Sequence, residues 1–290
     1  MSGPVTSSPL ARSWRSPRAI IGGILTALSG ACLVVALVPL VWLLLYVTVR
    51  AVGRLDVDLV TELPPAPGLA GGGLANALIG TLMVLLVAVV ISVPLGVLGA
   101  VHLSEFDRGG PWTRRIRFAT NILSGVPSII AGLLVFGLLV RTGLTGYSAI
   151  AGGAALALVM LPTIVRTAEE ALQLVPRDLR WAALGTGATQ SRTVWEVVLP
   201  GAAPAIATGV SLAIARAAGE TAPLLFTALF SPYWPETFRE PVATLSVLVY
   251  TFASVPFAPQ QELAWAAAFI LILVVLITKL LAARTFRERR

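Results

Sequence analysis

The chain has 290 residues, of which 57% are hydrophobic and only 12% are charged. A water-soluble domain carries about 25% charged residues, so the composition excludes an ordinary soluble protein and predicts an all-α, polytopic membrane protein. The formal net charge is +7, but the arginines flank apolar segments and form no basic stripe interleaved with aromatic residues, which argues against nucleic-acid binding.

Single residues exclude several kinds of chemistry. Cys32 is the only cysteine, so an internal disulfide is impossible. His102 is the only histidine, which excludes a metal site built from several histidines. No serine nucleophile motif and no pair of carboxylates suited to acid–base catalysis stands out. We therefore expect a chain that is not an enzyme and that holds no metal or cofactor of its own.

Apolar segments of about 20 residues predict membrane spans. The stretch 19–49 contains no Asp, Glu, Lys or Arg and is too long for the apolar region of a signal peptide, so we expect it to be retained. Pro94 is expected to kink the second span. The six predicted spans are 19–49, 74–101, 119–140, 146–165, a fifth that begins near Pro200, and 263–283.

The arginines predict the orientation of these spans. They gather before the first span, after the second, between the fourth and fifth, and in the tail 285–290, which all fall on one side if there are six spans. Both termini, including the segment 1–18, are therefore expected in the cytoplasm and beside anionic lipid. Segment 241–261 is apolar but its core is too short to cross a bilayer, so we interpret it as an outer-surface or re-entrant element.

The long segment between the fourth and fifth predicted spans has a pattern of its own. Two short helices are expected at 177–184 and 191–199, with Gly185 and Gly187 at the corner between them. We expect the second helix to end at Pro200. The two helices would then form a knob that protrudes from the membrane.

This segment resembles the cytoplasmic loop of ABC importer permeases. That loop carries Glu-Ala-Ala, three residues, Gly, nine residues, an aliphatic residue, any residue, Leu and Pro. The matching residues are Ala182, Ala183, Gly187, Val197, Leu199 and Pro200, while Trp181 stands where the family has glutamate. The resemblance implies that 167–199 is a coupling loop inserted into an ATPase subunit, with the contacts of Trp181 left open. The alternative is an amphipathic surface loop with a coincidental pattern.

Longer stretches resemble one branch of that family, the PstA-type permeases of phosphate importers. They are LPTIVRTAEEALQLVPRDLR, LAIARAAGETAPLLFTA and QQELAWAAAFILIL, the last with Gln260, Gln261 and Trp265. The resemblance implies a type I importer permease of six helices, with a permease domain over 74–284. It also implies a PstC-type permease partner, two copies of a PstB-type ATPase that binds ATP and Mg, and a PstS-type phosphate-binding protein outside.

The stretch ARAAGETAPLLF places charged residues in apolar surroundings, where a charge is expensive and usually functional. The guanidinium of Arg216 offers bidentate recognition of phosphate, and Glu220, four residues on, can neutralise it when no anion is present. Thr221 adds a hydroxyl, and Gly219 and Pro223 are expected to loosen the helix. The alternative is a purely structural ion pair.

Arg166 is the second candidate substrate residue. It is expected at the cytoplasmic end of the fourth span, where the side chain could instead reach the lipid headgroups. Three rival functions are a permease for another oxyanion such as phosphonate or sulfate, a secondary transporter, and a membrane-embedded enzyme. A secondary transporter would need inverted repeats, and no second copy of the fifth-span motif occurs in the first half.

Overall fold

The computed structural model describes residues 17–107 and 109–287, which divide into two compact units, one up to Val49 and one from Arg50 onward. The first unit is the body of α1 (Pro17–Val52), which contains the predicted span 19–49. Its side chains over residues 21–46 are exposed, as expected for an apolar helix that faces lipid. The predicted terminal segments 1–18 and 285–290 lie mostly outside the described residues.

The second unit is built around three long helices, α3 (Ala75–Val101), α6 (Ala149–Leu174) and α9 (Leu199–Ala218). Helix α3 packs along α6, and α6 packs along α9. A Cβ atom at Gly96 would lie only 2.6 Å from the Ile164 side chain. Small residues therefore allow the close helix approach that stabilises packing in lipid. The predicted second span, 74–101, agrees with α3 to within one residue, and Pro94 lies inside the helix.

The third predicted span is not one straight helix. Helix α4 (Pro111–Gly125) and helix α5 (Ser128–Val135), which continues into the π-helical turn Phe136–Val140, meet at a bend of 108°. The cause is Pro127, which forces the preceding Val126 into an extended conformation with ψ of 129°. Among the described residues, five helices are long and apolar enough to cross a membrane, or six if this bent pair is one span.

Helix α6 is longer than predicted. The sequence places the end of the fourth span at residue 165, whereas the helix continues to Leu174. It ends where Val175 adopts an extended conformation before Pro176. Arg166 consequently lies within α6, and the helix continues beyond it to Leu174.

The predicted coupling loop, 167–199, begins within the last turns of α6. Helix α7 (Arg177–Gly185) follows, and then a corner at Gly187 with φ of +90°. Helix α8 (Gln190–Thr193) then runs through the π-helical turn Val194–Val198 into α9. The prediction that the second short helix ends at Pro200 is therefore wrong. A proline inside a helix lacks the N–H group that would donate to a carbonyl of the preceding turn. Here the turn before Pro200 is a wider π turn, in which Leu199 N–H donates to Val194 C=O. The hydrogen-bond register is therefore shifted directly before the proline, and the helix continues through it.

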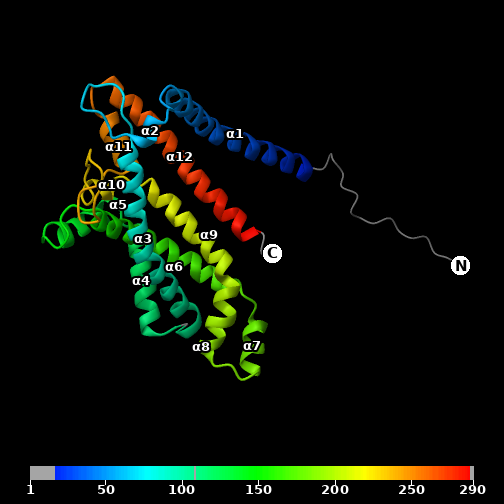
Figure 1. Ribbon diagram of the computed structural model, residues 1–290. Helices are drawn as coiled ribbons and strands as arrows, with labels where there is room; N and C mark the ends of the chain where they lie inside the picture. The colour runs from blue at the N-terminus through cyan, green and yellow to red at the C-terminus, as the bar shows by residue number, and fades with distance from the viewer. Residues whose placement is uncertain (1–16, 108, 288–290) are drawn as a thin grey trace. The chain divides into compact units, whose positions relative to one another are not determined.

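The remaining helices close the second unit. The short helices α2 (Asp58–Thr61) and α11 (Leu245–Ala253) lie at the end opposite α7 and α8, and α10 (Ala222–Leu225) lies beside α5 (Figure 1). Helix α11 packs against α12 (Ala258–Arg287), which contains the predicted last span. With nine residues, α11 is too short to cross a bilayer, in agreement with the interpretation of segment 241–261 as a non-spanning element.

Candidate functional site

Both predicted arginines line one cavity. It has a volume of about 550 Å³ and lies between α4, α5, α6 and α9, with Arg166 and Arg216 as its basic residues. Hydroxyl groups also line it, namely those of Ser124, Ser128 and Thr163. The arrangement combines two permanent positive charges with neutral hydrogen-bonding groups, which suits a small oxyanion.

Arg216 and Glu220 form the predicted ion pair, although not within one helix. Helix α9 ends at Ala218, and Glu220 follows in a tight turn whose N–H donates to Ala217 C=O at 3.1 Å. The Arg216 Nε atom lies 3.6 Å from Glu220 Oε1. The arginine side chain is 66% exposed and the glutamate side chain 17%. The guanidinium is thus accessible from the cavity, while the carboxylate is held against the protein.

The residues around this pair are placed by the same turn. Gly219 directly follows the last residue of α9. Thr221 precedes α10, and its backbone carbonyl accepts hydrogen bonds from the N–H groups of Leu224 and Leu225. The Thr221 side chain is half-buried and is not among those that line the cavity. Pro223 is buried against Gly132 of α5. A Cβ atom added at Gly132 would lie only 2.5 Å from the Cα atom of Pro223. The sequence predicts that the helix is loosened at Gly219 and Pro223. In the structure, α9 instead ends at Ala218, and a separate short helix, α10, begins at Ala222.

Arg166 is held by neutral partners. Its Nη2 atom donates to Asn121 Oδ1 at 2.8 Å and to Ser124 Oγ at 2.9 Å, both on α4. Among the described residues, no carboxylate forms a salt bridge with it, so its charge is oriented without being cancelled. The sequence prediction missed Asn121 and Ser124. Their spacing of three residues on one face of an amphipathic helix is the signal that could have found them.

The loop residues predicted to contact an ATPase lie at the far end of the second unit. Trp181 is 71% exposed, and the neighbouring side chains of Leu179 and Leu184 are also exposed. Of the other motif residues, Ala182, Gly187 and Pro200 are exposed, whereas Ala183, Val197 and Leu199 are partly buried. Helix α7 therefore presents an unpaired apolar surface of the kind that marks protein interaction sites.

A buried ion pair that the sequence did not reveal fixes this loop. Glu105, in the π-helical turn His102–Phe106 after α3, accepts from Arg180 Nε at 3.2 Å and from Nη2 at 2.8 Å. Arg180 also donates to the carbonyls of Leu172 and Val175 at the end of α6. The Glu105 carbonyl accepts from Gln190 Nε2 at 2.6 Å. The two charged side chains are only 5% and 13% exposed. We call this the Glu105–Arg180 clamp.

The turn after the clamp contains Asp107, outside the apolar span. Its carboxylate accepts hydrogen bonds from the N–H groups of Gly110 at 2.6 Å and Gly109 at 3.5 Å. These bonds, mainly that from Gly110, lower the pKa of Asp107 below its ordinary value because they stabilise the charged form. The ionised side chain thus helps to set the start of α4.

Comparison with known proteins identifies the family of the chain. The family described as binding-protein-dependent transport system inner membrane component matches residues 92–289. The phosphate transport system permease protein PstA of Yersinia pestis is 38% identical and aligns with 96% of this chain and 93% of its own length. The phosphate transport system permease protein PstA 1 of Mycobacterium tuberculosis is 40% identical, with 92% and 88% covered.

Solved structures support the fold. A bacterial alginate ABC transporter in complex with an alginate-bound periplasmic protein has a chain that matches with a TM-score of 0.67 at 16% identity, over 96% of this chain and 98% of that one. Sequence, fold and family match therefore agree: the chain belongs to the binding-protein-dependent transport system inner membrane components, and within them to the PstA permeases.

Proposed function

We propose that the chain is the permease subunit of an ATP-driven phosphate importer and forms half of the phosphate pathway. The observation that carries the proposal is the single cavity lined by both Arg166 and Arg216. The PstA names of relatives 38% and 40% identical supply the substrate. The exposed guanidinium of Arg216 and the uncancelled charge of Arg166 would together receive the anion.

Glu220 sets how tightly the anion is held. With phosphate absent, the carboxylate neutralises Arg216 across 3.6 Å. When phosphate arrives, its oxygens compete with that carboxylate for the same donors, so part of the binding energy is spent in displacing the pair. Binding is thereby weak enough for release, as a transport pathway requires.

The partners follow from the same assignment. A PstC-type permease would complete the pathway, two PstB-type subunits would bind ATP and Mg and dock on α7, and a PstS-type protein would deliver phosphate outside. The apolar surface around Trp181 supports docking at α7, because an exposed tryptophan and two leucines would be covered there. The arginine-rich segments support an orientation with both termini in the cytoplasm.

The test is phosphate uptake by the reconstituted importer with Arg216 variants. Arg216→Lys keeps the charge and loses the planar fork, so we expect uptake to fall by roughly tenfold, the factor that one hydrogen bond to a charged group contributes. Arg216→Ala combined with Glu220→Ala removes the ion pair without leaving an unpaired carboxylate. Uptake should stay impaired in this double variant although assembly is normal.

Arg141→Ala provides the control, because Arg141 is an exposed arginine outside the cavity. Its uptake should match that of the parent. Near-normal phosphate uptake by the double variant would show that the pair is only structural. Stimulation of ATP hydrolysis by a sulfate-loaded or phosphonate-loaded binding protein, but not by a phosphate-loaded one, would assign a different oxyanion.

A further inference from the structure

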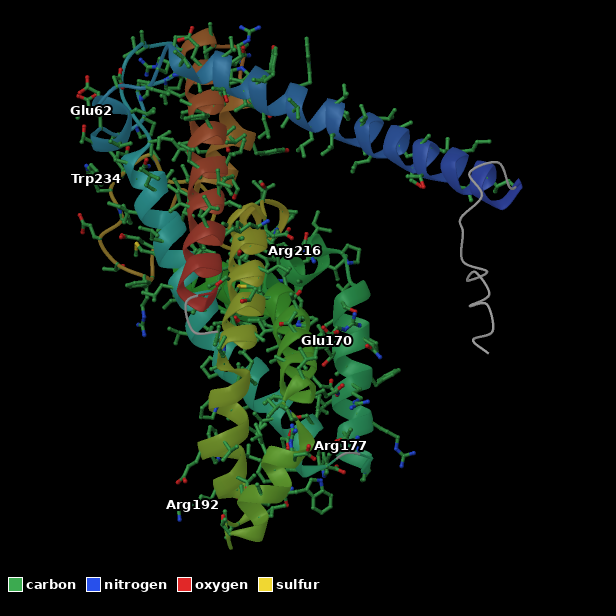
Figure 2. The ribbon with its side chains drawn as sticks, turned by 90° about the vertical axis from the view of Figure 1, so that its right-hand side faces the viewer. Glu62, Glu170, Arg177, Arg192, Arg216 and Trp234 are labelled. Atoms are coloured by element: carbon green, nitrogen blue, oxygen red, sulfur yellow. The ribbon has the colours of Figure 1, made fainter. Side chains whose placement is uncertain are left out.

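Two more cavities continue from the first toward α7, and neighbouring cavities share an arginine. The second cavity, of about 250 Å³, is lined by Arg166 together with Arg117, Thr120 and Glu169. The third, of about 350 Å³, is again lined by Arg117 and adds Arg177 beside the Glu105–Arg180 clamp. Arg166 therefore belongs to the first and second cavities, and Arg117 to the second and third. Figure 2 shows Arg216, Glu170 and Arg177 at successive levels along this side of the second unit.

The pair formed by Arg117 and Glu169 repeats the design of Arg216 and Glu220. Arg117 Nη2 lies 2.5 Å from Glu169 Oε1, and the arginine side chain is 49% exposed against 15% for the glutamate. In both pairs an accessible guanidinium from one segment meets a carboxylate that is mostly buried. Glu169 is also fixed by Gln173, whose Nε2 donates to the same oxygen at 3.4 Å. The carboxylate thus has a second partner on its own helix, while the guanidinium is the more exposed group of the pair.

Two such arginine–glutamate pairs would provide an anion that crosses the protein with two successive binding sites. An anion bound between two arginines moves on more readily if a next site of comparable affinity is within reach, because a single deep site would hold it. Arg180 cannot serve as that site, since its donors already bind Glu105 and the carbonyls at the end of α6. Arg117 can, because within the described part of the chain its guanidinium is bound by one side chain, the carboxylate of Glu169, which an incoming anion can replace.

We propose that Arg117 is a further anion-binding residue, which receives inorganic phosphate from the cavity of Arg166 and Arg216 and passes it on toward α7. The proposal rests on the proposed function. Phospholipid headgroups offer the same chemistry as free phosphate, and the surroundings of Arg117 favour the free ion. Arg115, on the same helix, lies 5.1 Å over the ring of the exposed Trp112, as expected beside lipid headgroups. Arg117 instead reaches α6 and the cavities there.

The experiment measures phosphate uptake and ATP hydrolysis in proteoliposomes that hold the complete importer. Arg117→Gln should lower uptake by roughly tenfold, since hydrogen bonds to a charged group are lost at one step of the path. Hydrolysis stimulated by the loaded binding protein should persist, so that less phosphate enters per ATP. The matched control is Arg114→Gln, an exposed arginine on the same helix that lines none of the three cavities.

Two further variants separate a path residue from a structural one. Arg117→Gln combined with Glu169→Gln leaves no unpaired carboxylate, so a merely structural pair would recover uptake and overturn the proposal. The path role predicts that this double variant stays impaired, and that Arg117→Lys recovers part of the rate. Parental uptake by Arg117→Gln would also overturn it.

Vesicle composition distinguishes the two sources of phosphate groups. The defect of Arg117→Gln should be the same in phosphatidylcholine alone and in mixtures with phosphatidylglycerol. A defect confined to the mixtures would mean that Arg117 binds an anionic headgroup and would overturn the path role. The Arg216 variants keep the two proposals separate: normal Arg216→Lys with impaired Arg117→Gln would contradict the first binding site while leaving the second.

Discussion

At the scale of single residues, the partners of an arginine decide what it can do. Arg216 and Arg117 each face a carboxylate, whereas Arg166, which lines the cavities on both sides, is held by the neutral oxygens of Asn121 and Ser124. Neutral acceptors orient a guanidinium and leave its full charge to act on an anion. Arg166 should therefore be the strongest attractor of the three.

Asn121→Asp tests this reasoning with a change of one atom type. The new carboxylate would pair with Arg166 and compete with phosphate, so we expect uptake to fall by roughly fivefold, which corresponds to about 1 kcal/mol for a pair in an accessible site. Asn121→Ala removes the acceptor without adding charge and should have a smaller effect. Rates of phosphate uptake in the reconstituted importer provide the comparison. If Asn121→Asp imports faster than Asn121→Ala, the charge of Arg166 is not what attracts the anion.

At the scale of elements, composition and periodicity predicted helices well where a helix is uninterrupted. Helix α3 agrees with the predicted span 74–101 because a long apolar run without charged residues is stable in lipid as a helix, even with Pro94 inside it. Proline alone does not predict where a helix ends, since one proline, Pro127, breaks the third span and another, Pro200, is accommodated within a continuous helical segment. A local sequence pattern does not show whether a π turn will form before a proline and allow the helix to continue without the proline N–H donor.

The candidate site divides in the same way. Arg216 and Glu220 are four residues apart, so their pairing could be predicted from the sequence. Glu105 and Arg180 are separated by 75 residues, and Arg166 and Asn121 by 45. These contacts depend on how α3, α4, α6 and α7 pack, and no periodicity within one segment encodes that packing. The cavity lined by Arg166 and Arg216 likewise depends on the bend in the third span, because Val126 and Pro127 of that bend are part of its lining.

The corner between α7 and α8 gives the prediction at this scale. Gly187 has φ of +90°, and a Cβ atom there would meet nothing within 4 Å, so only the backbone conformation restricts the residue. Gly187→Val should strain the corner by about 1–2 kcal/mol or reshape it. We expect membrane insertion to remain intact while ATP hydrolysis becomes uncoupled from uptake.

Gly185→Ala is the matched control for that variant. Gly185 also has open space around it, but its φ is not in the left-handed region, so an alanine fits without strain. Both rates, measured in the same proteoliposomes, should be parental for Gly185→Ala. Coupled uptake by Gly187→Val at the rate of Gly185→Ala would refute a role for the corner geometry.

At the scale of the whole molecule, the proposed function requires a surface at α7 to act on a cavity that lies between α4, α5, α6 and α9. The Glu105–Arg180 clamp joins three elements at the α7 end: the turn after α3, the end of α6 and α7 itself. Because α3 and α6 pack together along their length, we expect a displacement of α7 to move both helices together. The clamp is therefore expected to serve both stability and coupling.

Glu105→Gln tests whether the Glu105–Arg180 clamp contributes more to stability and coupling than an exposed ion pair does. It leaves Arg180 buried with a weaker partner, and breaking a buried pair costs about 3–5 kcal/mol. The control is Glu196→Gln, which breaks the exposed pair with Arg192, with side chains 67% and 59% exposed, and should cost below about 1 kcal/mol. Thermal unfolding of the purified importer in detergent should show a clear drop in Tm for Glu105→Gln only.

In proteoliposomes, Glu105→Gln should import less phosphate per ATP than Glu196→Gln, because α7 can then shift without moving α3. Arg180→Met combined with Glu105→Leu replaces the buried charges by apolar groups and should regain stability, as replacing a buried pair often does. It lacks the directional bonds to the carbonyls of Leu172 and Val175, so coupling should stay poor. A double variant that is stable and fully coupled would show that the clamp only fills space, since apolar packing alone would then transmit the motion of α7.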